Sequence, residues 1–306
     1  MDFRPAFPFR RALAASLALL VGAVSLAACG APTPHASGGP VIAIGAESQY
    51  ADVVRQLGGQ FVRVSAVMQS PTTDPHSFEV SAALATRVAN ADLVVQNGLG
   101  YDSFMNNLEQ ASPNAHRTVI VARSVLHLGS SAFDPHLWYD PTTMPLVAAA
   151  ITRALQHLRP SHAAYFADRL RRFDRSLAPW TEAIALFRAQ QPHLSVAVSE
   201  PVADRLLRAM GLTITTPVIL QSDVMNGIDP APQAIAIEQQ LLTHHHVAIF
   251  CYNEQVLDPL TDSFRRLAQR AGTPVVGVSE IMPLTQHYQT WMLDTTNQLA
   301  KAVAHA

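Results

Sequence analysis

The sequence predicts an α/β protein with two βα lobes of mostly parallel strands, joined by a long connecting helix. Residues 41–121 alternate short apolar runs with amphipathic stretches of helical spacing, and residues 194–303 repeat this alternation. A charged stretch of helical character, residues 161–190, separates the two regions. Strands that alternate with helices favour a parallel sheet covered by helices. The three observations together predict two such sheets and one stiff connection.

The first lobe is expected to span residues 41–158. Its predicted elements are strands at 41–45, 61–67, 91–95 and 118–121, and helices at 48–57, 81–90, 101–110 and 145–158. Ser48 is expected to cap the first helix, and the Gly58-Gly59 pair to end it. In a parallel sheet ligands collect at the carboxyl ends of the strands, so loops that follow these strands are candidate binding loops.

The second lobe is expected to span residues 192–306, with residues 159–191 forming the connecting helix. Its predicted elements are strands at 194–198, 212–215, 247–251 and 275–278, and helices at 202–210, 232–243, 259–271 and 288–303. Pro179 lies inside the connecting stretch. Because proline removes a backbone hydrogen bond and clashes with the preceding turn, we expect a kink or break near Leu177 and Ala178.

Residues 1–28 are predicted to be a signal peptide, with three arginines before an apolar run at 13–26. The following Leu26-Ala27-Ala28-Cys29 resembles a bacterial lipobox, which implies a diacylglycerol on Cys29 and cleavage just before it. The alternative is an uncleaved membrane helix, but the run is short for a span of about 20 residues. Residues 29–40 are expected to be a flexible tether, which places the protein on the extracytoplasmic face of the membrane, anchored by lipid.

The net charge and the cysteine content exclude some partners and some kinds of cross-link. The chain carries a net charge of −2, and its residues beyond position 28 are near −4 because the first 28 hold three arginines and one aspartate. This mild acidity argues against nucleic acid as a partner. The chain has only two cysteines, Cys29 and Cys251. Because Cys29 is the expected lipid attachment site, no intrachain disulfide is expected. Cys251 is expected to be a buried thiol of the core.

The tripeptide Asp-Pro-His occurs twice, as Asp74-Pro75-His76 and Asp134-Pro135-His136. Proline stiffens the backbone before each histidine, and Asp74 and Asp134 could orient the two rings. Imidazole is the commonest protein ligand for transition metals, so the two loops predict a metal site assembled from His76 and His136. The alternative is a pair of surface turns, because Asp-Pro is common turn chemistry.

Two carboxylates are predicted to complete this site from the second lobe. Glu200 and Glu280 follow the strands at 194–198 and 275–278, where a parallel sheet would direct them to the cleft between the lobes. Glu200 and Glu280 could each instead be an acid at a helix N-terminus, where the helix dipole stabilises a negative charge. Nitrogen and oxygen ligands without thiolate suit zinc, manganese or iron(II). Two carboxylates allow a higher coordination number, so Zn²⁺ and Mn²⁺ are both candidates and Fe²⁺ ranks behind them.

The chain resembles the solute-binding lipoproteins that capture zinc or manganese for bacterial ABC importers. The resemblance extends over most of residues 41–306 and is most specific in three stretches: Asp74–Glu79, Ala89–Gly100 and Asp134–Pro141. It implies two lobes joined by one long helix, metal in the interlobe cleft, and delivery to a membrane permease driven by a cytoplasmic ATPase. We expect the protein to act as a monomer.

The resemblance also implies a ligand at each of His76, His136, Glu200 and Glu280. Family members commonly have histidine at the third position and aspartate at the fourth, so this chain departs from them with two glutamates. The histidine-rich acidic loop of many zinc carriers is also missing. His244–His246 does not replace that loop, and we expect this run to end a helix rather than to bind metal.

Three other functions remain open from the sequence, and the first is a binding protein for a chelated metal, such as a siderophore or cobalamin, which would not need four ligands from the protein. A surface adhesin or scaffold could hold a structural metal in the same residues. A secreted metalloenzyme would need an open coordination position and a positioned base, and the sequence contains neither an HExxH motif nor a Gly-x-Ser-x-Gly motif. We therefore expect a binding protein rather than an enzyme.

Overall fold

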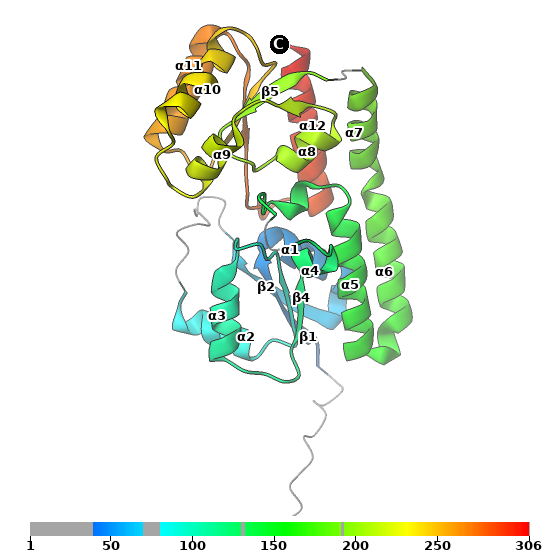
Figure 1. Ribbon diagram of the computed structural model, residues 1–306. Coiled ribbons are helices and arrows are strands. Elements are labelled where there is room, and N and C mark those ends of the chain that lie inside the picture. The colour runs from blue at the N-terminus through cyan, green and yellow to red at the C-terminus, as the bar shows by residue number, and fades with distance from the viewer. Residues whose placement is uncertain (1–38, 70–79, 130–131, 191–192, 306) are drawn as a thin grey trace, which may run out of the picture. The chain divides into compact units, whose positions relative to one another are not determined.

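The computed structural model describes residues 39–69, 80–129, 132–190 and 193–305, and these residues form two parallel sheets (Figure 1). The first sheet has the order β2-β1-β3-β4, with β1 (Val41–Glu47), β2 (Val62–Met68), β3 (Leu93–Gln96) and β4 (Thr118–Val121). The second has the equivalent order β6-β5-β7-β8, with β5 (Ser195–Val198), β6 (Thr213–Ile214), β7 (Phe250–Asn253) and β8 (Val275–Val278). We call each sheet with its helices a lobe, and the predicted fold class is confirmed.

The first lobe buries both faces of its sheet. Its helices are α1 (Ser48–Gly58), α2 (Ala82–Ala89), α3 (Ser103–Ala111), α4 (Ala122–Val125) and α5 (Thr143–Leu158), with short 3₁₀ turns η1 (Gly59–Phe61) and η3 (Leu137–Tyr139). Val41 and Ala43 of β1 pack into the core that α1 and α5 share, whereas Ile44 and Ala46 pack toward α2 and α3. Successive strand residues point to opposite faces, so a strand covered on both faces is apolar throughout.

The second lobe follows the same plan. Its helices are α8 (Asp204–Ala209), α9 (Val218–Met225), α10 (Pro232–Thr243), α11 (Pro259–Ala271) and α12 (Tyr288–Ala304). Helices α10 and α11 lie together on one side of the sheet, and α12 lies on the other (Figure 1). Phe250 packs into the first of these two layers, and Val198 and Leu299 pack into the second. No helix in the described ranges is both long and apolar enough to span a membrane.

The connection between the lobes is helical but interrupted. It consists of the turn η4 (Pro160–His162), α6 (Ala163–Ser176) and α7 (Ala178–Gln190). Helix α6 packs against α5, and α7 packs against α12, where Trp180 is buried and donates a hydrogen bond to Thr296 Oγ1 at 2.9 Å. The break falls at Leu177, as predicted. Pro179 is the second residue of α7, where its missing N–H costs little.

Two predictions about local structure were wrong. Ser48 does not cap α1: the N-cap is Glu47, without a side-chain cap bond, and the Ser48 hydroxyl instead donates to the Met282 carbonyl at 2.8 Å. Strand β7 begins at Phe250 rather than at Val247. The residues before it still bond to β5: Ala248 N–H donates to the Ser195 carbonyl at 2.7 Å, and the Ile249 carbonyl accepts a bond from Ala197 N–H at 3.0 Å. Both errors arise because contacts with residues distant in the sequence decide how a helix is capped and where a strand begins.

The run of three histidines ends α10, as the sequence indicated. His244 is the C-cap residue, and its N–H bonds to the Gln240 carbonyl at 3.1 Å. The N–H of His246 bonds to the Leu241 carbonyl at 3.2 Å. These bonds satisfy carbonyls that the last turn of a helix otherwise leaves unpaired.

Glu238 is a buried carboxyl in the second lobe. It projects from α10, is fully inaccessible to solvent, and accepts a hydrogen bond from Thr216 Oγ1 at 3.2 Å. Its other oxygen has no partner among the described residues. Burial raises the pKa of Glu238 to about 8, and the Thr216 hydroxyl offsets only part of this rise. The carboxyl is therefore neutral in the folded protein at pH 7.

We predict that Glu238 makes the folded protein less stable as pH rises. Because the pKa is raised from 4.5 to about 8 on folding, the stabilising contribution is fully present below pH 4.5 and is lost as pH rises toward 8. The Glu238→Gln variant lacks this titration, so its melting temperature relative to the wild type should increase from pH 5 to about pH 8 and then level off. A difference that stays constant over this range in calorimetry would contradict the prediction.

Candidate metal-binding site

The strand order places the same feature in both lobes. In each sheet the chain runs from the first strand to one side and then returns to the other side, so its order reverses between β1 and β3 and between β5 and β7. Ligands bind at the carboxyl ends of the strands that flank such a reversal. Glu200 and Asn253 lie at this point in the second lobe, and Glu280 follows the adjacent β8.

His136 is completely buried in the loop that leads into η3. The Asp134 carboxylate accepts a hydrogen bond from the His136 backbone N–H at 2.8 Å and lies 3.0 Å from its Nδ1. The rings of Tyr101 and Trp138 contact the imidazole edge-on, with centroids 5.8 and 5.5 Å away. Asp134 thus contacts both the backbone and the ring of His136, and Nε2 is directed at the second lobe.

Glu280 meets His136 from the second lobe. It is fully buried, and its Oε2 lies 3.5 Å from His136 Nε2. The same oxygen accepts a hydrogen bond from the Tyr101 hydroxyl at 2.8 Å. The Gln255 side chain accepts a bond from the Glu280 backbone N–H and holds the loop. An imidazole from one lobe and a carboxylate from the other are therefore adjacent in a site closed to solvent.

Glu200 is joined to Glu280 by an amide. Glu200 is 3% exposed, and its Oε1 accepts a hydrogen bond from Asn253 Nδ2 at 2.9 Å. Asn253 Nδ2 also donates to Glu280 Oε1. One buried amide group thus sets the separation of the two predicted carboxylate ligands.

The predicted site residues are only partly within the structure. His136, Glu200, Glu280 and Asp134 lie together, whereas His76, Asp74 and Cys29 lie outside the described residues. Within the described ranges, no three side chains of His, Cys, Asp or Glu converge closely enough to hold a metal ion. The described part therefore contains the His136–Glu280 pair, and the Asn253 side chain links Glu200 to Glu280.

Two residues of the site, Asn253 and Tyr101, were not predicted from the sequence. Asn253 is the last residue of β7, and it could have been found from the strand had its end been placed at Asn253 rather than Cys251. Tyr101 follows Gly98, Leu99 and Gly100, which all have positive φ. Such a run is costly for a residue other than glycine, so it indicates a loop whose path is set by a function or by close packing.

The electrostatics of the pair follow from burial and proximity. Burial alone lowers the pKa of the His136 imidazole, but the carboxylates of Asp134 and Glu280 raise it to about 10. Burial also raises the pKa of the Tyr101 phenol, and the charge of Glu280 adds to this rise. The imidazole is thus held as a cation against carboxylates, in a position where another cation would find the same attraction.

Arg205 fastens the His136 loop to the second lobe. This residue of α8 places Nε 2.9 Å from Asp134 Oδ2 and donates from Nη2 to the Asp134 carbonyl at 2.7 Å. Asp140 lies 3.9 Å from its Nη1. The guanidinium is 21% exposed, so these charge-assisted contacts are shielded from water better than a surface pair.

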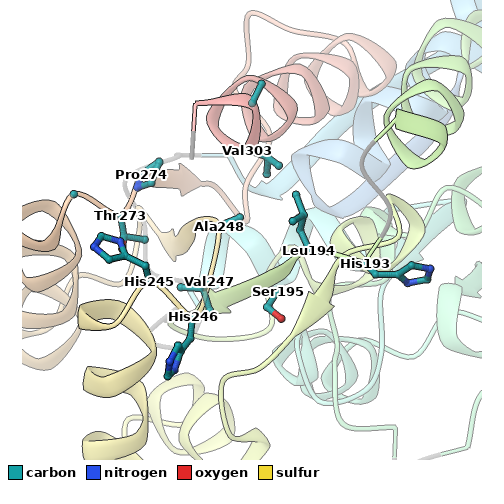
Figure 2. A pocket seen from close by; sticks show the side chains of 12 residues that line it. His193, Leu194, Ser195, His245, His246, Val247, Ala248, Thr273, Pro274 and Val303 are labelled. Atoms are coloured by element: carbon teal, nitrogen blue, oxygen red, sulfur yellow. The ribbon is translucent and has the colours of Figure 1, made fainter.

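A second group of histidines lines a cavity of about 630 Å³ in the second lobe, at the end of the sheet opposite Glu200 and Glu280. The cavity lies at the amino ends of β5 and β8 and is lined by residues that include Ser195 and Pro274. Figure 2 shows that the imidazoles of His193, His245 and His246 point away from one another. Ligands of one ion must converge, so this cavity is not a second metal site.

Comparison with known proteins places the chain among metal carriers. It is 25% identical over 167 residues to the manganese-binding lipoprotein MntA of Bacillus subtilis, covering 52% of this chain and 54% of that protein. It is 26% identical over 155 residues to the zinc-binding protein TroA of Treponema pallidum, covering 49% and 50%. The chain spans about half the length of the curated relatives it matches.

Solved structures share the fold over a larger part of the chain. FpvC of Pseudomonas aeruginosa, solved with Mn²⁺, has a TM-score of 0.72 at 22% identity over 87% of this chain and 98% of its own. The Mn-bound periplasmic metal-binding protein of Candidatus Liberibacter asiaticus has a TM-score of 0.68 at 16% identity, over 86% and 99%. At this identity the likeness shows the fold.

A protein-family match covers both lobes and the connecting helices. Residues 46–302 match the family described as zinc-uptake complex component A, periplasmic. This family and the relatives above are described as metal-binding or metal-uptake proteins and not as enzymes. The extent of the match shows that the chain belongs to the family of periplasmic components A of zinc-uptake complexes.

Proposed function

We propose that this protein captures one Mn²⁺ or Zn²⁺ ion outside the cytoplasm and delivers it to an ABC permease. The ion would be held by His76 and His136 of the first lobe and by Glu200 and Glu280 of the second. The observation that carries the proposal is the buried contact between His136 Nε2 and Glu280 Oε2, which come from different lobes. An ion bound there would join the lobes, and its release would require them to separate.

The donor set supports a borderline or hard divalent ion. Imidazole and carboxylate suit Zn²⁺ and Mn²⁺ alike. The buried Cys251 is no ligand candidate, because burial raises the pKa of its thiol far above the usual range and keeps it protonated. Two carboxylates would neutralise a divalent ion, which lowers the cost of burying it. MntA is named for manganese and TroA for zinc, and both ions are candidates here.

Asp134 and Arg205 support the site without touching the ion. Asp134 orients the His136 ring through Nδ1, and Arg205 holds Asp134 from the second lobe. Groups that orient a metal-bound imidazole in this way fix its tautomer and raise its basicity. The Arg205 contact also joins the lobes in the closed arrangement, so it favours capture over release.

The remaining parts of the proposal rest on the sequence and the family. We propose a signal peptide at 1–28, a lipid on Cys29 with a tether to residue 40, lobes at 41–158 and 192–306, and a connection at 159–191. The Leu26–Cys29 motif supports the anchor, and the description of MntA as a lipoprotein agrees with it. The protein would act as a monomer on the extracytoplasmic face, beside a permease driven by a cytoplasmic ATPase.

Replacing His136 with alanine should remove metal binding while the fold remains. Loss of a supporting contact alone costs about 10–100-fold in metal affinity, so loss of a ligand should cost more than about 100-fold for both Mn²⁺ and Zn²⁺. Calorimetric titration measures this, with the exposed His157 at the end of α5 as the matched control. If His136→Ala binds metal as tightly as His157→Ala, His136 is not a ligand.

The Arg205→Met variant should weaken metal binding by about 10–100-fold. Methionine keeps much of the apolar packing of the stem but removes every contact with Asp134, so the His136 loop loses its support. Arg172→Met is the control, since Arg172 pairs with Asp168 on an exposed face of α6. Equal affinities in the two variants would show that Arg205 has no part in positioning the loop.

The anchor can be tested through the two cysteines of the chain. Cells fed radiolabelled palmitate should incorporate label into the wild-type protein and into Cys251→Ala, because Cys251 is buried within β7. Cys29→Ala should carry no label and should leave the membrane fraction. Label retained on Cys29→Ala would refute the lipid anchor and leave the metal site unaffected.

A further inference from the structure

Glu47 is a buried carboxyl group that has no partner among the described residues. It is the last residue of β1, and its relative exposure is 0%. Neither of its side-chain oxygens has a hydrogen-bond partner among the described residues. Buried polar groups are almost always paired, so an unpaired carboxyl group at the ligand-binding edge of a parallel sheet is a candidate ligand. Burial, and then the charge of Asp102, raise the pKa of Glu47 well above its usual range, which favours the neutral acid while no cation is bound.

The position of Glu47 corresponds to that of Glu200 in the other lobe. Glu47 ends β1 and Glu200 closely follows β5, and these are the equivalent strands in the two sheets. Each lies beside the point where the strand order reverses, which is where open parallel sheets bind ligands. The fold therefore presents one carboxylate from each lobe at matching places.

Contacts of the neighbouring residues place Glu47 close to the Glu280 loop. The Ser48 hydroxyl donates to the Met282 carbonyl at 2.8 Å, and Gln49 Nε2 donates to the Glu280 carbonyl at 3.3 Å. The beginning of α1 is thus fastened to the loop that carries Glu280. Glu47 immediately precedes this contact.

Tyr101 lies between the proposed ligands of the two lobes. Its hydroxyl donates a hydrogen bond to Glu280 Oε2 at 2.8 Å, and its ring lies edge-on to the His136 imidazole. The beginning of α1 is bonded to the same Glu280 loop, so the end of β1 that carries Glu47 lies beside this group of residues.

We infer that Glu47 supplies a further oxygen ligand to the captured metal ion, an inference that rests on the proposed function. A third carboxylate beside Glu200 and Glu280 makes the ligand set richer in oxygen and permits a higher coordination number. Hard oxygen ligands suit Mn²⁺, whereas Zn²⁺ prefers four ligands in a tetrahedron. Glu47 therefore selects manganese over zinc.

The test compares Glu47→Gln with the wild type by competitive titration of Mn²⁺ and Zn²⁺, on the detergent-solubilised full chain. Glutamine keeps the shape of the side chain and removes the acidic group that could ionise and bind a cation. We expect the affinity for Mn²⁺ to fall by about 10-fold or more and that for Zn²⁺ to fall less. The melting temperature of the metal-free protein should change little, because glutamine has nearly the shape of the neutral acid that burial favours at this position.

Two further variants make the result decisive. Glu238→Gln removes another fully buried carboxyl, from α10, and should leave both metal affinities unchanged. Glu47→Asp keeps a carboxyl group but shortens its reach, and should also weaken Mn²⁺ binding. This variant replaces Glu47→Gln if Glu47→Gln does not fold.

Unchanged Mn²⁺ affinity in the folded Glu47 variants, with binding lost in His136→Ala, would overturn this inference alone. Equal losses for Mn²⁺ and Zn²⁺ would overturn the role of Glu47 in selectivity. A wild-type chain that binds neither ion would overturn the proposed function and this inference together.

Discussion

The burial of Glu280 against His136 is the constraint on which the rest of the site depends. A carboxylate removed from water costs several kcal/mol unless partners replace its hydration. Glu280 receives that replacement from both lobes: Tyr101 and His136 come from the first, and Asn253 comes from the second. Because these partners belong to separate sheets, the lobes must be closed for the charge to be compensated.

This constraint explains why both lobes direct polar groups to the same place. The two sheets have the same strand order, so the carboxyl ends of their strands offer equivalent positions. In the proposed site the first lobe would contribute imidazole nitrogen and the second would contribute carboxylate oxygen. An ion that used both would be held only while the lobes were together, and movement of the lobes would release it.

The sequence predicted the fold well because hydrophobic alternation reflects burial directly. The run at Val41–Ile44 and the interruption near Pro179 were both found where they were expected. The positions of Glu200 and Glu280 after their strands followed from the same pattern. His76 lies outside the described residues, so its role remains a prediction.

What escaped prediction depends on contacts between distant segments. Asn253 acts through an amide placed between two carboxylates, and its neighbours in the sequence do not reveal this. Tyr101 reaches Glu280 across 179 residues. Ser48 bonds to the Met282 carbonyl instead of capping α1, because a buried carbonyl from the other lobe competes for its hydroxyl. Hydrophobic periodicity carries no information on such pairings.

The central claim is that one ion joins the two lobes at His136 and Glu280. Crystals grown with Mn²⁺ and measured at the manganese absorption edge would locate that ion directly. The account predicts a single anomalous peak within about 2.0–2.3 Å of His136 Nε2 and of a Glu280 carboxylate oxygen. A peak at the histidines around His245, or no peak near His136 in metal-loaded protein, would contradict it.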